Sequence, residues 1–211
     1  MRVERRARSG RRRRVASLAV AVAVALVVAA CSTERPAAGP PVVPNDPLGF
    51  VVVGGSLARA AADRGGSDNT WPQRLFRNDL PPGTVYVNLG RNGFRLADAP
   101  ELEPDIAQLT PQLVIVWAGE DDVDAGVTPA AFAASYAQLL GRLVAPDRHI
   151  VVATLPGVDP AYNAAITSAA TAGGATVVDL ASEIDPADVA GGKLTRHGNE
   201  AVAAAFRSAI S

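Results

Sequence analysis

Five short runs of aliphatic, largely β-branched residues alternate with longer segments of helical character between residues 48 and 211. Runs that are apolar on both faces are typical of strands in a buried parallel sheet, because helices cover both sides of such a sheet. Parallel strands joined by helical crossovers give a three-layer α/β/α sandwich. We therefore expect one α/β domain with five parallel strands at 50–53, 85–87, 113–117, 150–154 and 176–178.

Three helices are expected around these strands. The segment 129–144 follows Thr128 as an N-cap and has Pro129 in its first turn. The segment 160–172 ends at the pair Gly173 and Gly174, and 195–210 closes the chain. Functional loops of such a domain lie at the carboxyl ends of the strands.

The first 47 residues have the composition of an export and anchoring segment. Residues 1–14 are rich in arginine, 15–30 are small and aliphatic, and the run stops at Cys31. A helix of that apolar run spans roughly 24 Å, short of the roughly 30 Å hydrocarbon core. The sequence Val-Ala-Ala-Cys at 28–31 resembles the bacterial lipobox, in which the cysteine is diacylated and becomes the mature N-terminus. The alternative is an ordinary signal peptide with an incidental cysteine.

These features predict a lipoprotein signal peptide at 1–30, lipidation at Cys31, a Pro-rich tether over 31–47 and a working domain at 48–211. The protein is then expected on the cell membrane, lipid-anchored through Cys31 at the extracytoplasmic face.

Charge and residue counts exclude several classes of function. Without the eight N-terminal arginines and Glu4, the chain has 12 basic and 20 acidic residues, a net charge of −8 that disfavours nucleic-acid binding. One cysteine and two histidines leave little for a disulfide framework or a zinc site. The acidic run from Glu120 to Asp124 lacks the EF-hand pattern, and Asp122 is expected to bind loop amides instead. We expect a monomer with no metal or other cofactor.

Four loops hold most of the chemically uncommon residues. They are Gly-Gly-Ser-Leu at 54–57, Asn-Leu-Gly-Arg-Asn-Gly at 88–93, Gly-Glu-Asp-Asp at 119–122 and Lys-Leu-Thr-Arg-His-Gly-Asn at 193–199. In order and spacing they resemble the SGNH, or GDSL-type, serine hydrolases, which are secreted esterases and acyl hydrolases with a flavodoxin-like sheet. The resemblance covers residues 48–211.

The resemblance implies that Ser56 is the nucleophile and that Gly90 supplies a backbone N–H to the oxyanion hole. Each residue also has a structural interpretation. In that interpretation Ser56 is the N-cap of a helix beginning at Leu57, and Gly90 is a turn glycine with positive φ. The implied ligand is a small acyl ester, or a glycan or lipid of the cell envelope.

Two departures from the family pattern affect the chemistry. Asp121 stands where the family has an asparagine that donates to the oxyanion, so it would help only when protonated. The last block fits in two registers. In the first, Lys193 replaces the catalytic histidine and Ala190 its aspartate; in the second, His197 takes the histidine's role and Leu194 replaces the aspartate.

Two hypotheses follow for the proton acceptor of Ser56. Asp121 and Lys193 form an ion pair that leaves the serine without a base, or His197 reaches Ser56 and is oriented by Asp188 or Glu200. The alternative for His197 is that it has no catalytic role and is an exposed residue in the first turn of a helix. The expected function is ester or acyl hydrolysis through Ser56, and the alternative is an impaired pseudo-hydrolase that binds a lipid, glycan or envelope protein in the same pocket.

Overall fold

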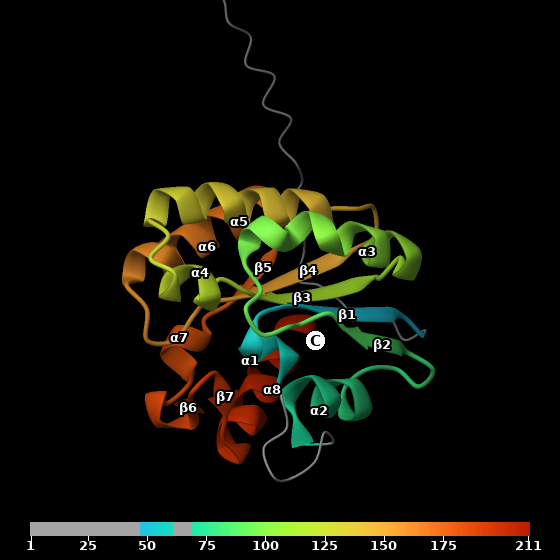
Figure 1. Cartoon of the computed structure of the whole chain (residues 1–211). Helices are drawn as coiled ribbons and strands as arrows, with labels where there is room; N and C mark the ends of the chain where they lie inside the picture. The colour runs from blue at the N-terminus through green and yellow to red at the C-terminus, as the bar shows by residue number, and fades with distance from the viewer. Residues whose placement is uncertain (1–46, 61–68) are drawn as a thin grey trace, which may run out of the picture. The chain divides into compact units, whose positions relative to one another are not determined.

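A parallel sheet of five strands forms the centre of the domain in the computed structural model, which describes residues 47–60 and 69–211. The strands lie in the order β2-β1-β3-β4-β5, so the predicted fold class is confirmed (Figure 1). Their bounds are β1 Gly49–Gly54, β2 Val85–Asn88, β3 Leu113–Trp117, β4 His149–Ala153 and β5 Thr176–Val178. The predicted signal peptide, Cys31 and the tether before Pro47 lie outside the described residues.

The strand order creates a topological switch point between β1 and β3. From β1 the chain moves outward to β2, and from β2 it returns to β3 on the other side of β1. The loops after β1 and β3 therefore leave the sheet in opposite directions and open a crevice at the carboxyl edge, where ligands bind in open α/β sheets. Register pairs Gly54 with Trp117 at this edge, so the loops that follow the two strands start side by side.

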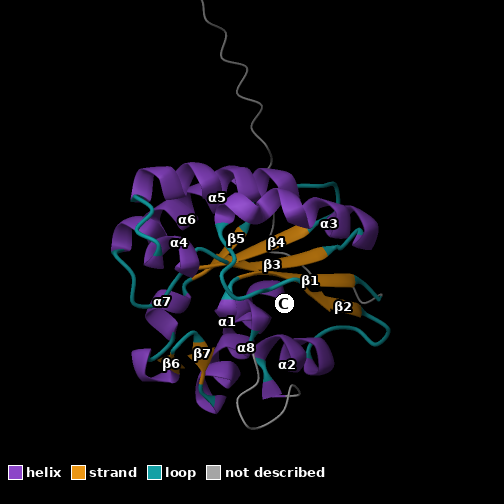
Figure 2. Ribbon diagram, in the orientation of Figure 1, coloured by secondary structure: helices purple, strands orange, loops and turns teal. Residues whose placement is uncertain are grey.

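Helices cover both faces of the sheet. In Figure 2, α3 (Glu103–Leu109), α5 (Pro129–Leu143) and α6 (Pro160–Gly173) lie on one face, and α2 (Trp71–Asn78) and α8 (Arg196–Ile210) lie on the other. The remaining elements are short: α1 Ser56–Arg59, a 3-10 helix at Leu96–Leu102, α4 Glu120–Asp124, α7 Leu180–Glu183, a 3-10 turn at Pro186–Asp188, and the hairpin strands β6 Val189–Ala190 and β7 Lys193–Leu194. None of the helices in the described part of the chain is both long and apolar enough to cross a membrane.

The helix ends follow the chemistry expected of their sequences. The Thr128 hydroxyl accepts a hydrogen bond from the Ala131 amide and caps α5, whose first residue is Pro129 with its preset φ. Gly174 ends α6 in the left-handed conformation at φ +69°. These are the caps predicted from the sequence.

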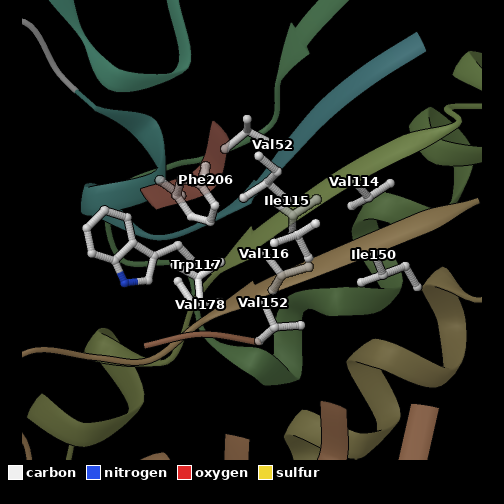
Figure 3. Packing of buried hydrophobic residues seen from close by; sticks show 14 of the residues in the cluster. Val52, Val114, Ile115, Val116, Trp117, Ile150, Val152, Val178 and Phe206 are labelled. Carbon is white, nitrogen blue, oxygen red and sulfur yellow. The ribbon is translucent and has the colours of Figure 1, made fainter. Parts of the chain in front are cut away.

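The core lies on both sides of the central strands, where every residue of β3 is buried (Figure 3). Trp117 at the end of β3 is fully buried, packs edge-on against Phe206 of α8, and donates its indole N–H to the Thr154 carbonyl at 3.2 Å. Trp71 of α2 stacks near the same phenylalanine at 4.7 Å between ring centroids. The aromatic cluster therefore fixes α2 and α8 on the sheet face below the crevice.

Candidate active site

Ser56 lies at the carboxyl end of β1 as the first residue of α1. Gly54 ends the strand with φ +146°, and a Cβ at this position would overlap the Trp117 carbonyl of β3, so only glycine permits the close turn. The N-cap of α1 is Gly55, and α1 has no side-chain capping bond. The interpretation of Ser56 as an N-cap for a helix starting at Leu57 is therefore wrong, and its hydroxyl is available for other contacts.

Glu120 is the side chain that contacts the Ser56 hydroxyl. The Ser56 Oγ donates to Glu120 Oε1 at 3.4 Å, and the Leu57 amide donates to the same oxygen at 3.3 Å. Among the described residues, Glu120 Oε2 is buried without a hydrogen-bond partner. Burial, and then the neighbouring Asp121, raise the pKa of Glu120 to about 7 against the hydrogen bonds from Leu57 and Ser56, which lower it.

The loop after β3 presents this glutamate because of its glycine. Gly119 has φ +116°, and a Cβ there would lie 2.6 Å from the Phe132 ring, so the turn into α4 requires glycine. The next residue, Glu120, then faces α1 across the switch point.

Asp121 and Asp122 have different environments on α4. The Asp122 carboxylate accepts from the Leu96 amide at 3.0 Å and is buried, which confirms its predicted bond to a loop amide. Asp121 Oδ2 is buried and, in the described part of the chain, has no partner. Burial and then Asp124 raise the pKa of Asp121, while Arg95 opposes the shift. Protonation, which would give Asp121 a donor, is therefore favoured relative to an exposed aspartate.

Gly90 packs tightly against α1. Its N–H donates to Asn88 Oδ1 at 2.8 Å, and its φ lies outside the positive region, so the interpretation as a positive-φ turn glycine is wrong. A Cβ at Gly90 would lie 2.5 Å from the Arg59 amide, so close approach of this loop to α1 explains the glycine. The loop after β2 thus lies beside α1, and its Gly90 amide is already hydrogen-bonded to a side chain.

The hairpin of β6 and β7 brings the last block of the sequence beside Ser56. A Cβ at Gly192, in the hairpin turn, would lie 2.6 Å from Ser56 Oγ. Lys193 follows this contact directly, as the first register places it, but its side chain is exposed and makes no ion pair with Asp121. The predicted Asp121–Lys193 ion pair is therefore wrong, because the lysine extends to solvent while the aspartate oxygen is buried.

His197 lies in the first turn of α8 and is held by Asp188. Its Nδ1 is 2.7 Å from Asp188 Oδ2, and the Thr195 hydroxyl donates to the other oxygen of the same carboxylate. The hydrogen bond to Asp188 raises the pKa of His197. The imidazole is 79% exposed, and no hydrogen bond joins it to Ser56. Asp188 rather than Glu200 orients the ring, and Glu200 pairs with Arg74 and Arg196 instead.

Sequence reasoning placed the loops of Ser56, Gly90, Asp121 and Lys193 at one sheet edge, and the structure brings the segments carrying Ser56, Gly90 and Lys193 into contact. It overlooked Glu120 as a partner of Ser56. The sequence feature that could have indicated this contact is Gly55 before the serine, together with Glu120 directly after Gly119. No group of three or more metal-ligating side chains occurs in the ranges 47–60 and 69–211.

A family model described as the GDSL-like Lipase/Acylhydrolase family matches residues 52–201. The chain belongs to this family. The match begins inside β1 and includes the loops at 54–57, 88–93, 119–122 and 193–199. No curated protein matches the chain significantly in sequence.

Solved structures share the fold at low sequence identity. An alpha/beta hydrolase enzyme from the metagenome of Lake Arreo, Spain, is 20% identical with a TM-score of 0.62, over 78% of this chain and 96% of that one. A putative lipolytic protein of the G-D-S-L family from Desulfitobacterium hafniense is 19% identical with a TM-score of 0.62, over 76% and 98%. An acetyl xylan esterase from Geobacillus stearothermophilus is 18% identical with a TM-score of 0.60, over 78% and 94%. The chain therefore shares the fold of these structures.

Proposed function

We propose that this GDSL-like hydrolase is a serine ester hydrolase in which Ser56 forms the acyl-enzyme. The supporting observation is the position of Ser56, half-buried at the switch point of the sheet, with its hydroxyl bonded to a carboxylate and free of any capping bond. A nucleophilic serine needs a proton acceptor within reach and space for the acyl group at the open edge of the sheet. Glu120 supplies an acceptor in contact with the hydroxyl, and the strand order places Ser56 at the edge of the sheet where ligands bind in open α/β folds.

The substrate is an acyl ester of a small alcohol or of an envelope glycan or lipid. The family descriptor names lipases and acylhydrolases, which supports an ester or acyl bond as the point of cleavage. Asp121 and the Gly90–Asn88 hydrogen bond weaken the oxyanion hole, so turnover should be slow compared with that of enzymes carrying the full set of donors.

One observation favours a second candidate function. No imidazole contacts Ser56, because His197 is exposed and Lys193 occupies the strand position beside the serine. A pseudo-hydrolase that retains the pocket to bind a lipid, glycan or envelope protein would have this arrangement. Such a protein would bind its ligand without breaking an ester bond.

A fluorophosphonate probe distinguishes the two candidates. The probe reacts with an activated serine and leaves an inert serine unmodified, so wild type is expected to label and Ser56→Ala is not. Hydrolysis of short-chain p-nitrophenyl esters by the same two proteins provides the second measurement. Absence of both labelling and turnover in folded wild type would contradict the hydrolase and leave the binding protein.

The location of the protein is a further part of the proposal. We infer that the chain is exported, lipidated on Cys31 and attached to the extracytoplasmic face of the cell membrane, on the basis of the 1–31 sequence pattern. The domain then acts on molecules of the envelope within the reach of its tether.

A further inference from the structure

We propose that Glu120 is the general base of this enzyme and that its carboxylate takes the proton of Ser56. The inference rests on the proposed function, since it requires Ser56 to act as a nucleophile. It assigns a role to Glu120, a residue to which the family resemblance gives none.

The contact geometry is the first argument. Glu120 Oε1 lies 3.4 Å from Ser56 Oγ, and it is the hydroxyl's hydrogen-bond partner among the described residues. The Leu57 amide, 3.3 Å from the same oxygen, holds the carboxylate against the start of α1. Proton transfer requires about 2.6–3.2 Å between heavy atoms, and such distances are often longer before substrate binds.

Gly55 provides the second argument, because it leaves the space that Glu120 fills. A Cβ at position 55 would overlap Glu120 Oε1 and lie 2.8 Å from Asp121 Oδ2. Gly55 has φ −87°, outside the positive-φ region that favours glycine, and the space filled by Glu120 is a direct reason for glycine here. The nucleophile block of the resembled family has aspartate at this position, and here the acidic groups come from α4 instead.

The electrostatic setting is suitable for a base near neutral pH. Burial keeps the pKa of Glu120 at about 7, close to the optimum for proton transfer under ordinary conditions. Asp121 on the same helix disfavours the negative charge of Glu120. The buried Tyr136 phenol of α5 also faces Glu120, and burial and then Glu120 raise the pKa of Tyr136. On the hairpin side the charged group is Lys193, whose side chain is exposed.

The other candidate bases do not reach the serine. His197 is hydrogen-bonded to Asp188 and 79% exposed, and Lys193 makes no hydrogen bond to Ser56. Glu120 is thus the titratable group that contacts the hydroxyl.

The reaction balances with the ester and water alone. Ser56 Oγ bonds to the acyl carbon as its proton passes to Glu120 Oε1, and the bond to the leaving oxygen breaks as that oxygen takes the proton from Glu120. Water then gives a proton to Glu120 and bonds to the acyl carbon through its oxygen. The acyl bond to Oγ breaks, and Oγ recovers the proton from the glutamic acid.

The test measures the rate constant of fluorophosphonate labelling from pH 5 to pH 9 in the full-length protein. Glu120→Gln keeps an oxygen that can accept from Leu57 but has no basicity, and Glu183→Gln is the matched control at an exposed carboxylate. In wild type and in the control, labelling should rise with pH around the Glu120 pKa of about 7. Glu120→Gln should label about 100-fold more slowly and lose that inflection.

Two variants keep the result interpretable. Gly55→Ala should slow labelling as well, because its methyl group displaces Glu120 while both Ser56 and the carboxylate remain. His197→Gln tests the competing base. Labelling of Glu120→Gln within threefold of wild type with an unchanged pH profile would overturn the assignment. Loss of the pH inflection in His197→Gln would overturn it as well.

The outcomes separate this inference from the proposed function. Wild type that labels on Ser56 while Glu120→Gln labels equally well leaves a serine hydrolase with a different base. Folded wild type that never labels overturns both. If Glu120→Gln does not fold, the pH profile of His197→Gln decides the matter: an inflection near pH 7 that persists without the imidazole supports Glu120, and a flat profile between pH 6 and pH 8 contradicts it.

Discussion

Glu120 is destabilising in its charged form, because the folded protein raises its pKa from 4.5 to about 7. Between these values the folded state binds more protons at this site than the unfolded chain does, so the free energy of unfolding falls as pH rises. Each unit of pKa difference corresponds to about 1.4 kcal/mol, so the loss amounts to about 3 kcal/mol by pH 8. Buried charges at functional sites commonly have such a cost.

Glu120→Gln should therefore be more stable than wild type at pH 8 and close to it at pH 4.5. Urea denaturation at the two pH values measures the difference, which should approach about 3 kcal/mol at the higher pH. Glu183→Gln, at an exposed carboxylate, should follow wild type throughout. Equal stability of wild type and Glu120→Gln at both pH values would contradict burial of this carboxylate.

Under the proposed function, Asp121, the second residue of α4, would limit the oxyanion hole. Asp121→Asn supplies the side-chain amide that the family pattern has at this position, so kcat/KM for p-nitrophenyl acetate should rise by about tenfold or more. The gain should be larger at pH 8 than at pH 5, because a higher pH removes the proton that lets the native aspartate donate. Unchanged or reduced kcat/KM at pH 8 would show that Asp121 does not face the developing oxyanion.

At the residue scale, the sequence predicted which residues belong to the candidate site better than it predicted which side chains contact each other. Ser56, Gly90, Asp121 and Lys193 were recognised from short blocks, but the Asp121–Lys193 pair was wrong because charge and proximity along a sheet edge do not specify side-chain direction. The Ser56–Glu120 contact depends on the space left at position 55, which is visible only once the two loops are placed in three dimensions.

At the element scale, long buried segments were predictable and short exposed ones were not. The strand 113–117 was placed with its observed bounds because its five residues are apolar and buried on both faces. The hairpin strands β6 and β7 have two residues each, too few for a hydrophobic period, so they were not predicted. The helix α2 was also missed, although Pro72 in its first turn is typical of a helix start.

The junction between the hairpin and α8 depends on Thr195. Its hydroxyl accepts from the Gly198 amide at 3.0 Å as the N-cap of α8 and donates to Asp188, which in turn holds His197. Thr195→Ala should lower the free energy of unfolding by about 1–2 kcal/mol through the lost cap. Chemical denaturation checks the size, and Thr195→Ser, which retains the hydroxyl, should restore most of the loss. An unchanged midpoint in Thr195→Ala would contradict the capping role.

At the scale of the whole molecule, we expect the acidic domain and the basic N-terminal segment to have different roles. The domain supplies the strand-end site, and the pattern ending at Cys31 predicts attachment to a membrane. Under the proposed function, this anchor would raise the local concentration of envelope esters around the domain.

Cys31→Ala should abolish lipidation without affecting the domain. In cells fed a palmitate analogue, wild type should incorporate it and partition into the detergent phase, whereas Cys31→Ala should do neither. Purified domain beginning near residue 47 should hydrolyse soluble esters at the wild-type rate. Incorporation of the analogue by Cys31→Ala would place the modification elsewhere.

The most direct measurement of the central claim is peptide mapping of the covalent adduct that forms when the full-length protein reacts with a fluorophosphonate. We predict a single phosphonylated peptide that carries the modification on Ser56, with formation promoted as pH rises through about 7, where Glu120 ionises. An adduct on another residue, or an unmodified protein that remains folded throughout, would contradict it.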